Sequence, residues 1–166
     1  ARAVVWEHNT HVGDARYTDM ADEGEFNVGQ RVREVYGDDR VVLVGFSTYQ
    51  GTVIAGDEWG APMRVMPVPA GREGSYEDVF HRMGAGDKLL LVGQAPPTPE
   101  LLAPRGHRAI GVVYRPQFEA YGNYVPTVLP RRYDALLFIE RTRALDPLHL
   151  VVRHDGEAPE TYPSGM

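Results

Sequence analysis

The unbroken apolar run at residues 41–46, Val-Val-Leu-Val-Gly-Phe, constrains the fold of this chain more than any other feature. A strand with one face in water alternates apolar and polar residues, so a run without alternation indicates a strand buried on both faces of a sheet that helices cover. Residues 2–6, 88–92, 110–114 and 134–139 are predicted as further strands. We place residues 2–6 and 88–92 near the centre of the sheet.

Two segments between these strands carry helix signals. Asn27 and Gln30 are spaced as a capping box and Gly37 supplies a stop, which predicts a helix between them. A second capping pattern starts at Ser75 and predicts a helix to about residue 83. Residues 52–55 are expected to resume a strand after Gly51, and 63–68 to form an edge strand because they contain a proline. Residues 10–25 and 121–126 are expected to be loops. We therefore predict an α/β fold with a mixed, mainly parallel sheet flanked by helices.

Length and composition favour a single unit over residues 1–166. A chain of 166 residues that is 43% hydrophobic can bury one core. A net charge of -6 argues against nucleic acid as a partner, and 0 cysteines exclude disulfides, thiolate catalysis and cysteine-bound zinc. No apolar run approaches the ~20 residues that span a bilayer, so we expect a cytoplasmic protein with no membrane partner.

The segment His8-Asn9-Thr10-His11 follows the first predicted strand. Open α/β sheets place their sites at strand ends, and an imidazole with an ordinary pKa of ~6.5 can accept and return a proton near neutral pH. His8 and His11 are therefore the predicted catalytic residues. Their rings converge only if the chain bends there, which the turn formers Asn9 and Asp14 favour.

Other side chains are assigned lesser roles or rejected. Asn9, Asp14, Tyr49 and Tyr124 are predicted to contact substrate. Ser47 follows a hydrophobic strand, but a nucleophile elbow requires glycine where Tyr49 stands, so a serine hydrolase is not predicted. A metal held by His8, His11 and Asp14 is the rival use of the same atoms. The leading prediction involves no cofactor and no metal.

Several motifs in order along the chain resemble the erythromycin esterase family. They are residues 6–14, residues 27–30 with Arg33, residues 44–46 followed by 51–53, residues 110–114, residues 124–126 and the ending Pro159-Glu160-Thr161-Tyr162-Pro163. The resemblance implies an erythromycin-esterase-like fold and hydrolase activity, in some members on macrolide lactones, which links such proteins to antibiotic resistance. It also implies that His8 and His11 occupy the two histidine positions of the family's site.

The resemblance further implies a histidine and glutamates from an earlier part of the family's chain, and these have no counterpart here. This chain therefore resembles the C-terminal portion of such a hydrolase domain. Three interpretations are open: a separate chain completes the site, the sequence is a processed fragment, or it is inactive alone. Because residues 2–6 are placed mid-sheet, we expect a missing N-terminal half or a complementary chain to pair beside them.

The predicted function is an esterase-type hydrolase that activates water with histidines and cleaves a lactone or other ester. The predicted site-facing loops carry few cations, so we expect a neutral or cationic, partly apolar small molecule, such as a macrolide, rather than a phosphate. The alternatives are the metal-dependent hydrolase and a non-catalytic binding or accessory module whose aromatic pocket contains Trp59, Tyr121 and Tyr124.

Overall fold

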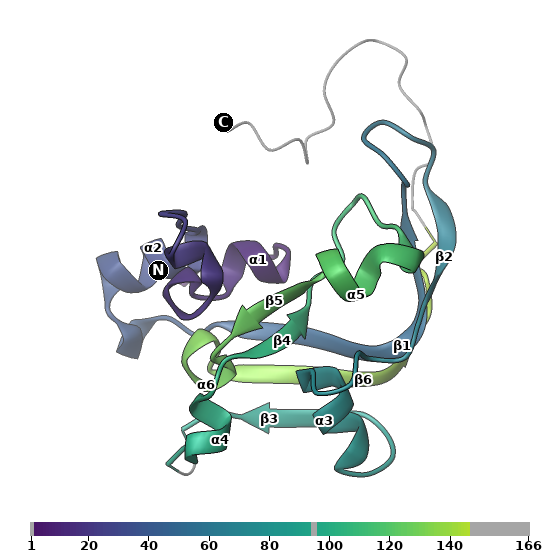
Figure 1. Ribbon diagram of the computed structural model, residues 1–166. Coiled ribbons are helices and arrows are strands. Elements are labelled where there is room, and N and C mark those ends of the chain that lie inside the picture. Colours follow the sequence, from purple (N-terminus) through teal and green to yellow (C-terminus); the bar gives the residue numbers. More distant parts are fainter. Residues whose placement is uncertain (1, 94–95, 147–166) are drawn as a thin grey trace.

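A computed structural model describes residues 2–93 and 96–146 (Figure 1). Its main sheet has 4 strands in the order β2-β1-β6-β3, and a 2-stranded sheet pairs β4 with β5. The strands are β1 Val44–Ala55, β2 Arg64–Val68, β3 Lys88–Leu91, β4 Arg105–Arg108, β5 Tyr124–Thr127 and β6 Ala135–Thr142.

Helical segments connect the strands. The α-helices are α1 Asn9–Val12, α2 Val28–Tyr36, α3 Tyr76–Arg82, α4 Pro99–Leu102, α5 Glu119–Gly122 and α6 Leu129–Arg132. The 3-10 turns are η1 Ala15–Tyr17, η2 Asp19–Ala21, η3 Asp38–Arg40 and η4 Pro116–Phe118. The two predicted helices are confirmed as α2 and α3. Asn27 Oδ1 accepts from the Gln30 amide at 2.9 Å, Ser75 Oγ accepts from the Asp78 amide at 3.3 Å, and Gly37 ends α2 at a φ of 87°.

The α/β class is confirmed, but the expectation of a mainly parallel sheet is wrong. Only β1 and β6 run parallel in the described main sheet, with Phe46 opposite Leu137, whereas β2 and β3 pair antiparallel with their neighbours. The short connection from β1 to β2 forces an antiparallel pair, because a parallel return needs a crossover of a dozen or more residues.

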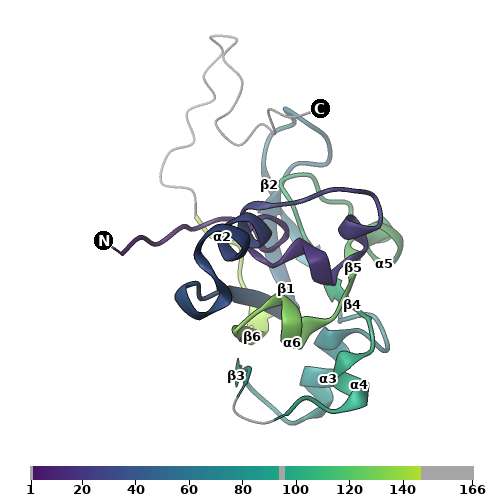
Figure 2. The same cartoon turned by 90° about the vertical axis from the view of Figure 1, so that its left-hand side faces the viewer.

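The core lies on one face of the main sheet. Aromatic and aliphatic side chains from α3, α6 and β6 form it, and these are Leu43, Tyr76, Phe80, Leu129, Tyr133, Leu136 and Phe138. A smaller cluster joins Ala55, Met66, Val68 and Tyr114. Figure 2 shows α3, α4, α6 and the β4–β5 hairpin on the same side of β1, β6 and β3. One sheet face therefore carries the helices and the core.

Within residues 2–93 and 96–146, no helix covers the opposite face of these strands, against the prediction that helices cover both faces. Val44 and Phe46 of β1 are 37% and 38% exposed, and Leu89 and Leu91 of β3 are 60% and 47% exposed. In the register, Phe46 lies opposite Leu137, which lies opposite Leu89, so these side chains share one surface. We call Val44, Phe46, Leu89 and Leu91 the open sheet face.

Two predicted strands are wrong. Residues 2–6 form no strand, and Val4 and Trp6 are 93% and 82% exposed. The argument for a missing neighbour beside them therefore fails. Residues 110–114 form no strand either, because only Val113 makes a bridge, to Gly56. The strand in this part of the chain is β4, and its polar sequence Arg-Gly-His-Arg carries no apolar pattern that would predict a strand.

Other boundaries also shift. The run 88–92 gives β3, but β3 is the last strand of the described sheet order, and β6 is the one strand that it pairs with among the described residues. Residues 52–55 continue β1 through Gly51 without a break, and β2 is the predicted edge strand. Residues 10–25 hold most of α1 and two 3-10 turns, and 121–126 contain the end of α5 and most of β5. The motif at 159–163 lies outside the described residues. Within residues 2–93 and 96–146, no helix is long and apolar enough to cross a membrane.

Candidate functional site

His8 is held by the chain at both ring nitrogens. It is the N-cap of α1, where Nδ1 accepts from the Thr10 amide at 3.3 Å and lies 2.8 Å from Thr10 Oγ1. Nε2 lies 2.8 Å from the Ile110 carbonyl oxygen. A carbonyl only accepts, so Nε2 carries the proton and Nδ1 is the acceptor. Burial lowers the pKa of His8, and the charges of His11 and Arg132 lower it further. His8 is therefore an oriented, neutral ring.

His11 differs from His8 because its ring is open. The two ring centroids are 6.2 Å apart, and the His11 side chain is exposed. Within the described part of the chain, no hydrogen bond reaches the His11 ring. The nitrogens of His11 are therefore accessible to a water molecule or a substrate, whereas those of His8 are occupied.

Asn9, between the two histidines, is fixed at its side chain and its backbone. Its Oδ1 accepts from the Phe46 amide at 3.0 Å, and its Nδ2 donates to the Phe46 carbonyl at 2.5 Å. Arg132 Nη2 and the Tyr133 hydroxyl donate to the Asn9 carbonyl at 3.2 and 3.3 Å. The segment His8-Asn9-Thr10-His11, called the histidine segment below, therefore lies along the edge of β1 near the start of that strand, where β2 does not pair. The prediction that it lies at the carboxyl end of a strand is wrong.

Asp14 is buried and engaged by arginines. Its side chain is 0% exposed, and its Oδ2 lies 2.6 Å from Arg16 Nη2 and 3.3 Å from Arg33 Nη1. Burial alone would raise the pKa of Asp14, but the hydrogen bonds and charge of Arg16, with the bond from Arg33, outweigh it and lower the pKa. Arg33 also pairs with Asp134 at 2.9 Å. These contacts tie α2 and η1 to the start of β6.

The residues proposed as metal ligands are not grouped as a metal site requires. Across residues 2–93 and 96–146, no three histidine, aspartate or glutamate side chains are close enough to hold one ion. The contacts of Asp14 explain why, because its carboxylate turns toward Arg16 and Arg33. The trio His8, His11 and Asp14 therefore does not assemble in this chain.

The structure places Tyr49 and Tyr124 around Arg108. The Tyr49 ring stacks on His81 with centroids 3.7 Å apart, and the Tyr124 hydroxyl accepts from the Arg72 amide at 2.8 Å. Arg108 Nη1 donates to the Tyr49 carbonyl at 2.8 Å, and its guanidinium lies 5.5 Å from the Tyr124 ring. Both tyrosines are half-buried, and their polar contacts are with the chain itself.

Sequence reasoning missed a buried histidine beneath the segment. His107, on β4, is 1% exposed and hydrogen-bonds through its ring to the Phe46 carbonyl, the oxygen that Asn9 also contacts. Burial, followed by the charge of Arg132, lowers the pKa of His107 to about 3. A lone histidine in a polar stretch gave no signal in the sequence, because its partners come from β1 and α6.

Glu77, on α3, is a second buried group that the sequence did not reveal. It is 0% exposed, and its Oε1 accepts from Ser47 Oγ at 2.7 Å and from the Arg108 amide at 3.0 Å. Burial raises the pKa of Glu77. Its Oε1 lies 3.8 Å from His107 Nε2, so the two groups are neighbours below the sheet edge. Ser47 is thus engaged by a carboxyl group, consistent with its rejection as a nucleophile.

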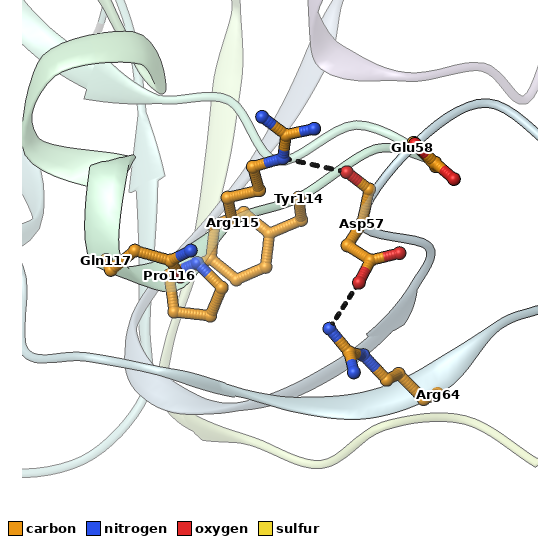
Figure 3. Close-up of a pocket in the computed structure, with 7 residues that line it drawn as sticks. All are labelled: Asp57, Glu58, Arg64, Tyr114, Arg115, Pro116 and Gln117. Carbon is orange, nitrogen blue, oxygen red and sulfur yellow. Dashed lines mark hydrogen bonds and ion pairs between the residues drawn. The ribbon is translucent and has the colours of Figure 1, made fainter. Parts of the chain in front are cut away.

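A separate polar pocket of about 260 Å³ opens beside the β1–β2 connection (Figure 3). Seven residues line it: Asp57, Glu58, Arg64, Tyr114, Arg115, Pro116 and Gln117. Asp57 accepts from Arg64 Nη2 at 2.7 Å through its side chain and from Arg115 Nε at 2.8 Å through its carbonyl. None of the predicted site residues lines this pocket, and neither do Trp59, Tyr121 and Tyr124, the proposed aromatic pocket.

Two solved structures resemble this fold. A Bacillus cereus protein matches with a TM-score of 0.69 at 20% identity, covering 84% of this chain and 33% of its own. A succinoglycan biosynthesis protein matches with a TM-score of 0.66 at 22% identity, with the same 84% and 33% coverage. These likenesses concern the fold. This chain spans about a third of the length of both proteins.

The sequence itself was compared with family models. The erythromycin esterase family matches residues 1–142, which include the histidine segment, both sheets and the buried groups beneath them. The resemblance seen in the motifs is therefore confirmed over most of the chain. On this match, the chain belongs to the erythromycin esterase family.

Proposed function

We propose that this chain supplies one side of the active site of a hydrolase that cleaves a lactone or another carboxylic ester. The observation that carries the proposal is the contrast between the two histidines: His11 is exposed with open nitrogens, and His8 beside it is half-buried and oriented by hydrogen bonds at both ring nitrogens. Family membership supports the hydrolase class. Neutral imidazole is suited to accept a proton from water near neutral pH.

Each histidine has a different role in this proposal. His11 accepts the proton of the attacking water and returns it to the leaving alcohol. His8 holds the turn, through Ile110 and Thr10, so that His11 faces the substrate. No carboxylate within the described residues contacts the His11 ring, so the group that orients its proton comes from outside this segment.

The substrate in this proposal is a neutral or cationic, partly apolar ester, and a macrolide lactone fits that description. Asn9 and Asp14 contribute by holding the segment, because their polar atoms contact Phe46, Arg16 and Arg33. Tyr49 and Tyr124 stay predicted substrate contacts, and a cytoplasmic location stays a prediction. Resistance to macrolides would follow only if the substrate is one.

We further propose that residues 1–166 are one unit of a larger hydrolase domain and that the remainder of that domain covers the open sheet face. Leu89 and Leu91 are 60% and 47% exposed, and contiguous apolar side chains at this density are typical of a buried interface. The match covers only 33% of each of the two similar structures, so they contain further polypeptide that could occupy this face. A missing N-terminal half is thus supported by the bare face, and no longer by residues 2–6.

The docking proposal is tested with the remaining part of the domain supplied as a separate chain. Leu89→Lys should weaken association at least tenfold, because it places a charge in an apolar interface. Val35→Lys is the matched control, because Val35 on α2 is 55% exposed and lies off the sheet. Equal binding by both variants and the wild type would reject the open sheet face as the interface.

The hydrolase proposal is tested on the complete protein with model lactones and esters. His11→Ala should lower kcat/KM by a hundredfold or more, the range expected for loss of a general acid–base group. His8→Ala should lower kcat/KM as well, because it removes the ring that caps α1 and bonds Ile110, so that His11 is no longer held toward the substrate. Val35→Ala is the control, because Val35 on α2 is 55% exposed and is none of the predicted site residues. Turnover at the wild-type rate in both His8→Ala and His11→Ala would contradict the proposal.

The alternative is a binding module that keeps the scaffold without the reaction. The observation that favours it is the lack of any third acidic or histidine partner grouped with His8 and His11 in the described residues. Ligand-induced thermal stabilisation without product, measured with the rest of the domain present, would support this alternative against the hydrolase.

A further inference from the structure

Arg132, the last residue of α6, is a deeply buried cation beside the histidine segment. Its side chain is 1% exposed, Nη1 donates to Thr127 Oγ1 at 2.7 Å, and Nε has no hydrogen-bond partner. Two other buried arginines form ion pairs, Arg33 with Asp14 and Arg108 with Glu119. None of the ion pairs among the described residues includes Arg132.

A buried guanidinium with no carboxylate within ion-pair distance is unfavourable, because the Thr127 hydroxyl, the Asn9 carbonyl and the Tyr133 side chain beside it do not offset the lost hydration of a full charge. Burial accordingly lowers the pKa of Arg132, although the more distant charges of Asp14 and Asp19 oppose this. Packing alone does not account for it, since a neutral side chain of similar length could fill the same space at lower cost. The retained charge therefore indicates a local electrostatic role.

The chain makes room for this guanidinium next to α1. A Cβ at Gly13 would lie 2.5 Å from Arg132 Nε and 2.7 Å from the Tyr133 hydroxyl. Both side chains then reach the Asn9 carbonyl, at 3.2 and 3.3 Å. Gly13 thus lets Arg132 lie directly beneath the residue that separates the two histidines.

We propose that Arg132 is a positioning residue for the hydrolytic site: its guanidinium anchors the Asn9 carbonyl and sets a permanent positive charge beneath His8. The expected effect on catalysis rests on the proposed hydrolase function. The bond of Arg132 to the Asn9 carbonyl and its charge beneath His8 are formed by residues of this chain and do not depend on that function.

The charge acts on His8 together with its other neighbours. The titratable groups that face His8 are His11 on α1, Arg132 on α6 and His107 on β4. A cation beneath His8 disfavours the imidazolium, so it favours the neutral ring whose Nδ1 accepts from the Thr10 amide and opposes the bond to the Ile110 carbonyl, which raises the pKa of His8. The same positive field stabilises negative charge that develops on a substrate carbonyl oxygen beside the segment.

The test is an NMR titration of the His8 ring in Arg132→Met, Arg132→Lys and Arg131→Met. Loss of the charge in Arg132→Met should raise the His8 midpoint by about half a pH unit or more. Arg132→Lys keeps the charge and should stay near the wild-type midpoint. Arg131 precedes Arg132 on the same turn and is exposed, so Arg131→Met controls for the same change in net charge. An unchanged midpoint in Arg132→Met, or an equal shift in Arg131→Met, would overturn the proposal.

Gly13→Ala gives a second route if Arg132→Met does not fold. The added methyl group displaces the guanidinium without removing it, so the His8 midpoint should rise by a smaller amount. A folded Gly13→Ala protein with an unchanged midpoint would also overturn the proposal. These titrations need no turnover, so their failure is distinct from failure of the hydrolase proposal. In the complete enzyme, Arg132→Met should lower kcat more than it raises KM.

Discussion

The side-chain amide of Asn9 bonds both backbone polar groups of Phe46, accepting from its N–H at 3.0 Å and donating to its C=O at 2.5 Å. A neighbouring strand would satisfy the same two groups. β2 does not pair with the part of β1 that contains Phe46, and there the Asn9 side chain forms these hydrogen bonds instead. The Asn9 side chain therefore attaches the histidine segment to the sheet.

Asn9→Ala should detach this segment from β1. The Phe46 amide should then exchange with solvent about fivefold faster or more, because loss of one hydrogen bond is worth about 1 kcal/mol. Hydrogen exchange of the Phe46 amide measures this directly. Asn123→Ala is the control, since it removes an amide that bonds the Ala109 carbonyl instead. Unchanged Phe46 exchange in Asn9→Ala would show that the segment is held elsewhere.

Asp14→Asn should lower the free energy of unfolding by about 3 kcal/mol, because it removes a fully buried carboxylate that pairs with the exposed Arg16 and with the buried Arg33, which keeps its pair with Asp134. Chemical denaturation measures the loss. Asp38→Asn should cost less than about 1 kcal/mol, because Asp38 is 76% exposed and lies 3.9 and 4.0 Å from the same arginines.

The lowered pKa of the Asp14 carboxylate predicts that stability depends on pH. The folded-state pKa of Asp14 is depressed, so its contribution to stability is complete above its ordinary pKa of 3.8 and is lost as pH falls through the lower folded value. In Asp14→Asn this part of the acid destabilisation should be absent. An identical acid profile in the variant and the wild type would contradict the assignment.

The lowered pKa of His107 predicts a second dependence of stability on pH, at higher pH than that of Asp14. Its pKa falls from 6.5 to about 3 on folding, so the unfolded chain binds the extra proton and stability decreases as pH falls below 6.5. The slope should approach about 1.4 kcal/mol per pH unit between these values. His8, whose pKa is also lowered, acts in the same direction. His107→Gln should flatten the dependence. A slope in His107→Gln equal to that of the wild type would contradict this account.

Local signals predicted the helices well. Asn27 and Ser75 cap α2 and α3 as their spacing indicates, because a cap depends on residues within one turn. Strand order was beyond such signals. The sequence of β3 is apolar enough for a central strand, yet in the described part of the chain it pairs only with β6, since pairing depends on segments far along the chain.

The candidate site was predictable only in part. The motif at His8 and His11 was visible, but its place on β1 was not, because Asn9 meets Phe46 across 37 positions of sequence. His107 and Arg132 reach the segment from β4 and α6, over still longer separations. The apolar run 41–46 predicted burial on both faces, and the open sheet face shows that only one face is covered within the described part of this chain.

Chemical rescue in the complete hydrolase tests the division of labour between the histidines most directly. Because the His11 ring makes no hydrogen bond within the described residues, free imidazole should restore turnover to His11→Gly. It should not restore His8→Gly, because the lost ring also capped α1 and bonded Ile110. The account predicts ester hydrolysis that rises with imidazole concentration in His11→Gly alone. Full hydrolysis by His11→Gly without imidazole, or rescue of His8→Gly instead, would contradict it.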